Sequence, residues 1–458
     1  MCLRWIAMAQ DATRVRIDAF DWVAAMPVLN LLKTFRTAIA PTRMAPAVLL
    51  VVLMFLIGHG LDLIWGARVA PGEFEQYLAM ASDDFDQWHA KRSAGPITDD
   101  HRGVFAAALR AEVAAFQGFI ASAVRLDFGL ETFINDRPHL GGGVAGALWV
   151  MVLGVPGWLL STYPGFTAVF CLLAFVVLCG LGGLITRLAA VQACTGEPAR
   201  LGAAAGFVAR RYVWFFLTPV IPLAVALLLG LVLMLAGLVF FNLPVLDVAG
   251  ALLMGPMLLV GLAIATLFVG LLLGGNLLLS AVAVEGTDAF DAISRAFNYA
   301  LGRPLRFLVY QLVVIVYGAV TYVLVGVMVF LTLWLTQRFL SVWAFAEVGS
   351  GVPTAGETTR LEAILPEPVP GKLYTPPHWS KLGESAWGTA AAGIASAWVQ
   401  LLLAILPAYA LCYYLTAQTW VYLLLRRATD GTEFEEHDQQ PPDLPAAPNK
   451  IEAPAEPS

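Results

Sequence analysis

Apolar runs alternate with shorter polar segments along most of this chain. A helix needs about 20 predominantly apolar residues to cross a bilayer. Six runs meet this requirement, approximately at 45–65, 165–186, 212–241, 256–279, 305–336 and 388–425. The pattern therefore predicts an all-α, polytopic helical membrane protein with about six transmembrane helices.

Three other stretches have helical patterns but are not predicted to cross the membrane. Residues 66–143 carry two apolar stripes at three-to-four spacing among many polar residues, which predicts an extracytoplasmic helical hairpin. Residues 144–160 are apolar but short, and Gly154-Val155-Pro156-Gly157 interrupts them. This stretch and residues 245–256 are predicted to be re-entrant or interfacial helices, and the pattern does not decide between these two forms.

These elements divide the chain into segments with different expected roles. In chain order we expect a cytoplasmic N-terminal segment with an interfacial helix (1–44), the first transmembrane helix (45–65), the extracytoplasmic hairpin (66–143), a central membrane domain with spans two to five (144–340), an extracytoplasmic Pro/Gly-rich segment (341–386), the sixth transmembrane helix (387–427) and a disordered acidic cytoplasmic tail (428–458).

A short charged segment between two apolar runs has the pattern of an amphipathic helix over 287–302. Thr287 or Asp288 is the expected N-cap, and Gly302-Arg303-Pro304 ends the helix. Asp291 and Arg295 are four residues apart and are predicted to pair. We expect this helix at the cytoplasmic membrane surface, either as a simple reversal between two spans or as an element that binds a partner or gates.

An internal pseudo-repeat is indicated in the middle of the chain. A shift of ninety residues aligns Gly196 with Gly286, Ala199 with Ala289 and Phe207 with Phe297. Each copy follows a span, contains a cytoplasmic helix and leads into the next span. The identity is low, so a chance alignment of similar loops is an equal alternative.

Composition and charge support the membrane prediction and suggest an orientation. Hydrophobic residues make up 59% of the chain and charged residues only 13%, against about a quarter charged in soluble domains. Lys and Arg outnumber acids in residues 1–44 and 187–212, whereas acids dominate residues 66–143. Positive charge stays inside, so both termini are predicted to be cytoplasmic. A nucleic-acid partner is not expected, because the sequence contains no broad basic region.

Six polar residues are candidates for a functional role. Glu285, Asp288, Asp291 and Arg295 belong to the amphipathic helix and its entry, and His59 and Asp62 lie three residues apart near the outer end of span one. Ionisable residues in a span point to function, but both of these residues can also form a plain interfacial pair. The sequence contains no nucleotide, hydrolase or metalloprotease motif, so no catalytic residue, cofactor or metal is predicted.

Two segments carry a resemblance to known proteins. EGTDAFDAISRAF at 285–297 and YLLLRRATDGTEF at 422–434 resemble a family of uncharacterised bacterial polytopic inner-membrane proteins. The resemblance implies a place in the bacterial cytoplasmic membrane and no particular activity. The first segment is also weakly similar to the membrane domain that accompanies some glycerophosphodiester phosphodiesterases, although this chain has no phosphodiesterase domain.

These observations favour a non-enzymatic scaffold or assembly component, with the lipid bilayer and other membrane proteins as its candidate partners. The alternative is a transporter or lipid-handling permease with a midplane site at the Pro-interrupted spans. Coupled pumps use carboxylates at membrane depth, and the predicted spans lack them at midspan. The oligomeric state does not follow from the sequence.

Overall fold

The structure is a computed structural model that describes residues 27–66, 68–93, 102–129, 142–242, 246–344, 359–369, 377–378 and 386–431. Throughout these ranges the regular elements are helices, and one isolated antiparallel bridge joins Val69 to Arg102. The predicted all-α, polytopic fold is therefore confirmed. The extreme N-terminal segment and the acidic tail beyond Gly431 lie outside the described residues.

The helices vary from one turn to about eleven turns in length. Their bounds in chain order are η1 Pro27–Leu32, α3 Lys33–Ala38, α4 Pro41–Trp65, α5 Glu73–Ala79, α6 Ser82–Ser93, α7 Val104–Val124, α9 Gly143–Trp149, η2 Val150–Gly154, α10 Val155–Thr162, α11 Pro164–Val177, η3 Leu178–Gly182, α12 Gly183–Thr195, α13 Leu201–Phe241, α14 Leu246–Leu252, α15 Met254–Gly274, η4 Gly275–Leu277, α16 Leu278–Glu285, α17 Ala289–Gly302, α18 Pro304–Ser341, α19 Arg360–Ile364, α21 Ala386–Leu403 and α22 Ile405–Asp430.

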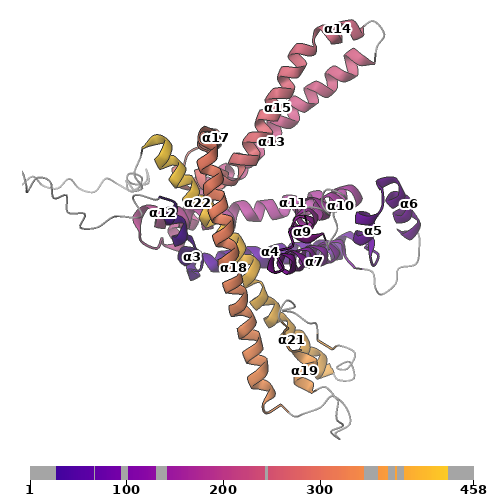
Figure 1. Ribbon diagram of the computed structural model, residues 1–458, viewed down its shortest axis with the longest axis vertical. Helices are drawn as coiled ribbons and strands as arrows, with labels where there is room; N and C mark the ends of the chain where they lie inside the picture. Colours follow the sequence, from indigo (N-terminus) through magenta and orange to yellow (C-terminus); the bar gives the residue numbers. More distant parts are fainter. Residues whose placement is uncertain are drawn as a thin grey trace, which may run out of the picture.

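A central body joins three arms that point in different directions (Figure 1). The body consists of α3, α12, α16, α17 and α22, and its core is the largest cluster of buried apolar side chains. Arm one consists of α4, α7 and α9 to α11, with α5 and α6 at its tip; arm two consists of α13, α14 and α15; arm three consists of α18, α19 and α21. Arm one has a second apolar core of its own.

Helix α22 is the centre of the body. Every residue from Leu415 to Leu425 is buried, and α22 packs against α3, α4, α12, α16, α17 and α18. Small side chains permit this close packing, because Ala281, Ala283, Ala292, Ala296 and Ala417 in the same core have no exposed surface. The helix that carries the second resemblance segment is thus the one around which the others are arranged.

Among the described residues, eight helices, and not six, are long and apolar enough to cross a membrane. The two additional ones are Val104–Ala123 and Gly143–Thr162, which were predicted to be an outer hairpin and a re-entrant or interfacial piece. Val104–Ala123 contains only two charged residues, Arg110 and Glu112, because alanines fill most positions between its larger apolar side chains. With 21 residues, α7 is about 31 Å long, close to the thickness of a bilayer core.

The charge distribution that predicts the orientation is compatible with six spans and with eight. Counting 144–160 as a seventh span would move Arg210 and Arg211 to the outer side of the membrane. A second additional span, α7, restores the original side for every later segment, since two crossings cancel. The predicted number of spans was too low because the two stretches were considered separately.

The backbone pattern suggested by the pseudo-repeat occurs three times in the described ranges. A short helical segment ends at a non-helical residue, at Ala40, Arg211 or Arg303, and an outgoing helix then enters the arm. We call the three short segments elbow one (27–40), elbow two (201–211) and elbow three (289–303). Each arm returns to the body through a helix that ends at a glycine in the left-handed region, Gly196, Gly286 or Gly431, with φ between 66° and 75°; such glycines cap helix C-termini at no steric cost.

Candidate functional site

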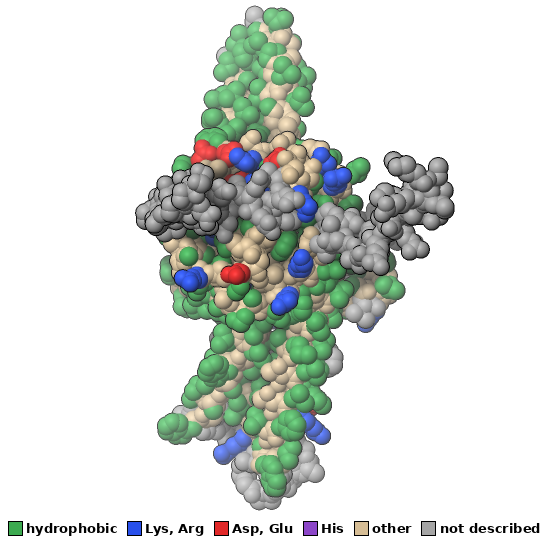
Figure 2. Space-filling view, turned by 90° about the vertical axis from the view of Figure 1, so that its left-hand side faces the viewer, with side chains coloured by type: hydrophobic (Ala, Val, Ile, Leu, Met, Phe, Trp, Pro, Cys, Tyr) green, Lys and Arg blue, Asp and Glu red, His purple; other side chains and the backbone are tan. Residues whose placement is uncertain are grey.

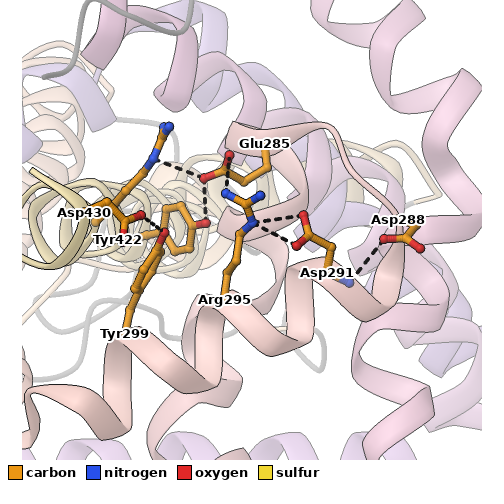
Figure 3. A network of polar contacts seen from close by, with 8 residues as sticks. Glu285, Asp288, Asp291, Arg295, Tyr299, Tyr422 and Asp430 are labelled. Atoms are coloured by element: carbon orange, nitrogen blue, oxygen red, sulfur yellow. Dashed lines mark hydrogen bonds and ion pairs between the residues drawn. The ribbon is translucent and has the colours of Figure 1, made fainter. Parts of the chain in front are cut away.

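The C-terminal end of α16 is where the body gathers its charged side chains (Figure 3). Glu285 is the last residue of α16, and its side chain is only 2% exposed. The Tyr422 hydroxyl donates to Glu285 Oε1 over 2.8 Å. Arg295 Nη1 lies 3.3 Å from Oε2, and Arg426 Nε lies 3.4 Å from Oε1. One buried carboxylate therefore joins α16 to α17 and α22, and we call Glu285, Asp291, Arg295, Tyr422 and Arg426 the Glu285 cluster.

Three of the other predicted residues lie on α17 or at its start. Arg295 Nε donates to both carboxylate oxygens of Asp291 over 3.0 and 2.9 Å, so the predicted i,i+4 pair is present. Asp288 is the N-cap of α17 and accepts from the Asp291 backbone N–H over 3.2 Å. The hydrogen bond from Arg295 holds the pKa of Asp291 below its usual value. Both partners are more than a third exposed, so this pair lies on the surface while Glu285 is enclosed.

Further cations surround the same helix end. Arg187 Nη1 donates to the Ala283 carbonyl over 2.7 Å, and Arg211 Nε donates to the Gly286 carbonyl over 2.9 Å. Both guanidinium groups also lie over the Phe207 ring, at 3.9 and 4.5 Å from its centroid. Unpaired carbonyls and the helix dipole favour cations at a helix C-terminus. Consequently α12 and α13 are tied to α16 as well.

One more contact closes the site on the α22 side. The Tyr299 hydroxyl of α17 donates to the Asp430 carboxylate near the end of α22. Burial, followed by the neighbouring Asp430, raises the pKa of Tyr299 above its usual value. The rings of Tyr299 and Tyr422 pack 5.4 Å apart, so aromatic and ionic contacts act on the same pair of helices.

Sequence reasoning missed the partners of Glu285 on α22. Tyr422 and Arg426 are separated from Glu285 by 137 and 141 residues, so local helical spacing gives no sign of them. One signal in the sequence could have indicated these contacts. The two segments that carry the resemblance, 285–297 and the described part of 422–434, contact each other here, so their polar residues could have been considered as possible partners.

His59 and Asp62 lie apart from this cluster, in arm one. Asp62 accepts from the backbone N–H groups of Phe105 and Ala106 over 2.8 and 3.0 Å, so it caps the N-terminus of α7. Its carboxyl group leaves no room for a side chain at Gly103, where a Cβ would lie 2.2 Å away. His59 instead contacts the Phe55 carbonyl and packs against the Phe55 and Phe105 rings. The two residues thus hold α7 beside α4 through different contacts, Asp62 through hydrogen bonds and His59 through ring packing.

Another buried carboxylate, which was not predicted, lies at the tip of arm one. Glu73 is 2% exposed and accepts from the Tyr163 hydroxyl over 2.9 Å and from the Ala70 N–H over 3.1 Å. His89 Nε2 lies 3.7 Å from the same carboxylate. These contacts fasten α5 and α6 to the turn between α10 and α11.

Polar side chains within the long apolar helices bond to one another. Gln311 of α18 and Gln418 of α22 exchange two amide hydrogen bonds of 2.8 and 2.9 Å. The Tyr414 hydroxyl bonds Asn276 over 2.6 Å, and Ser280 lies 3.2 Å from Thr419. These pairs all attach α22 to a neighbouring helix, so their evident role is packing.

Arg43, near the start of α4, points into the protein. It is 2% exposed and donates to the Thr37 and Leu188 carbonyls and to the Gln192 side chain. It therefore fastens α4 to α12 inside the protein.

No group of three or more His, Cys, Asp or Glu that could hold a metal ion occurs among the described residues. Comparison with protein-family models, with curated proteins and with solved structures finds no match for this chain. The two resemblances therefore remain predictions.

Proposed function

We propose that this chain is a non-enzymatic scaffold of the bacterial cytoplasmic membrane, with both termini in the cytoplasm. In this proposal the body, tied together by the Glu285 cluster, fixes three arms, and arm two binds the helices of other membrane proteins. The observation that carries the proposal is the exposure of arm two. Only 6% of the most apolar window of Leu201–Phe241 and 11% of that of Met254–Glu285 are buried within the protein.

The divergence of the arms explains this exposure (Figure 1). Helices α13 and α15 pack on each other, but beyond the body they have no other arm beside them. Their outward leucines, such as Leu227, Leu258 and Leu262, are each more than 60% exposed. Lipid or other membrane helices must cover these flanks.

Small residues on arm two support helix partners rather than lipid alone. A Cβ built at Gly230 or Gly237 of α13, or at Gly255 or Gly261 of α15, would meet nothing within 4 Å. Small residues let helix backbones approach closely within a membrane, where packing contacts replace the hydrophobic effect as the driving force. Gly274 shows such an approach within the chain, because the Phe297 ring of α17 packs directly against it.

The permease alternative receives less support from the same helices. A cargo site at membrane depth needs polar groups that are available to the cargo. The amide pair Gln311–Gln418 and the Tyr414–Asn276 bond instead use their polar atoms within the protein. This arrangement suits a rigid support better than a binding site that opens and closes.

Affinity purification from native membranes in a mild detergent tests the scaffold proposal. We expect specific membrane proteins to copurify with the wild-type chain. They should be lost when Leu227, Leu231 and Leu238, a stripe on α13 that is exposed throughout, are all replaced by alanine. The matched control replaces Leu312, Leu324 and Leu335, three exposed leucines of α18. Retention of all partners by the α13 variant at normal abundance, or copurification of lipid alone with the wild type, would contradict the proposal.

A further inference from the structure

The exposed cations of the body stand next to exposed apolar side chains, and this combination occurs at each elbow. Elbow one exposes Leu32 and Ile39, elbow two exposes Leu201, and elbow three exposes Phe290 and Leu301. Arg36, Arg210 and Arg306 are exposed on or directly after the three elbows. Apolar side chains beside cations are the signature of segments that lie in a membrane interface.

These arginines differ from the ones that hold the body together. Arg187, Arg211, Arg295 and Arg426 are partly or fully buried and contact the end of α16. In the described part of the chain, by contrast, no hydrogen bond or ion pair joins the side chain of Arg36, Arg210 or Arg306 to another group. Figure 2 views the body from the side opposite arm one and shows basic side chains spread around it. Their charge is directed outward.

We infer that the three elbows, which we together call the collar, bind the anionic headgroups of membrane lipids, with Arg36, Arg210 and Arg306 contacting lipid phosphates. Leu32, Leu201 and Phe290 enter the upper acyl region beside them. Charge complementarity with acidic phospholipid selects the occupant, since cationic clusters at helix ends attract anionic lipid while apolar side chains anchor the segment. This inference does not depend on the scaffold proposal.

Lipid retention by the purified full-length chain tests the collar. The protein is reconstituted in vesicles with equal amounts of phosphatidylglycerol and phosphatidylcholine, extracted in mild detergent, and its retained lipids are measured. We expect enrichment of phosphatidylglycerol. One cation at an anionic surface contributes about fivefold, so Arg36→Gln, Arg210→Gln and Arg306→Gln together should lower the enrichment by up to about a hundredfold.

Two further variants make the result specific. The control carries Lys91→Gln, Arg92→Gln and Arg102→Gln, which remove three exposed cations from arm one, and it should keep the wild-type enrichment. Replacing Arg36, Arg210 and Arg306 by lysine should also keep the wild-type enrichment of phosphatidylglycerol, because the charge remains. This variant shows whether a loss in the glutamine variant comes from the lost charge or from misfolding. The inference is overturned if the wild type shows no enrichment, if the control loses as much as the glutamine variant, or if the glutamine variant retains it.

Discussion

Removing the Glu285 carboxylate should destabilise the protein far more than removing the visible surface pair beside it. Glu285 is 2% exposed, and the Arg426 side chain that faces it is 10% exposed. Deleting one partner of a buried ion pair leaves the other charge in a poorly solvated place and costs about 3–5 kcal/mol. Glu285→Ala also removes the acceptor of the Tyr422 hydroxyl. We expect a total loss of about 3–5 kcal/mol, because these contributions are not additive.

Asp291→Ala is the matched control for this prediction. It removes a carboxylate that binds Arg295, as Glu285 does, but both Asp291 and Arg295 are more than a third exposed. Solvent screens such a pair, which contributes about 0.3–0.5 kcal/mol. The two acids thus differ about tenfold in expected effect while lying only six residues apart.

Unfolding of the purified variants in detergent, followed by intrinsic fluorescence, measures both effects. The double variant Glu285→Ala with Arg426→Ala should recover part of the loss, because it also removes the buried charge that Glu285 neutralises. The cluster would not be the link that holds α16, α17 and α22 together if Glu285→Ala were no less stable than Asp291→Ala. The same conclusion would follow if the double variant lost as much stability as Glu285→Ala and Arg426→Ala lose in sum.

Four other outcomes follow from particular contacts. Asp62→Ala should cost about 1 kcal/mol and speed hydrogen exchange at the Phe105 and Ala106 amides, which it caps; unchanged exchange would refute the cap. Gly274→Ala should cost about 1–3 kcal/mol in thermal unfolding because its Cβ would lie 2.7 Å from the Phe297 ring, whereas Gly261→Ala on the same helix should be neutral. Because the pKa of Asp291 is lowered, its stabilisation is complete above about pH 4 and is lost as the pH falls through the folded-state pKa, so Asp291→Asn and the wild type should unfold alike in stronger acid. A single cysteine that replaces Asp127 should have the same accessibility to an impermeant thiol reagent as one that replaces Arg210 if eight helices cross the membrane. If six cross, its labelling should match that of a cysteine at Ser93.

Local sequence signals predicted the elements that depend on neighbouring residues. Asp288 and Gly302-Arg303-Pro304 predicted helix 287–302, and α17 covers Ala289–Gly302 with Asp288 as its cap. Gly270 and Gly274 have the four-residue spacing that is typical of a close helix approach, and both face Phe297 of α17. Capping, helix termination and small-residue spacing act within a few turns, so they can be recognised in a single sequence.

Features that depend on distant contacts were not predicted. The sequence drew attention to Asp291 and Arg295 because their spacing is visible, whereas the buried acid is Glu285 and its partners are on α22. Asp62 looked like a partner for His59, yet it caps a helix whose first residues follow more than forty positions later. The span count failed for a different reason, because α7 is rich in alanine and its apolar stripe was assigned to an extracytoplasmic hairpin.

The most direct test of the scaffold account is photo-crosslinking from arm two in living cells. A photoreactive residue placed at Leu231 of α13, or at Leu262 of α15, is exposed at the surface of the arm. The account predicts crosslinks from these positions to the helices of specific membrane proteins, and weaker or no protein crosslinks from Leu312 of α18. Crosslinks from arm two to lipid alone would contradict it.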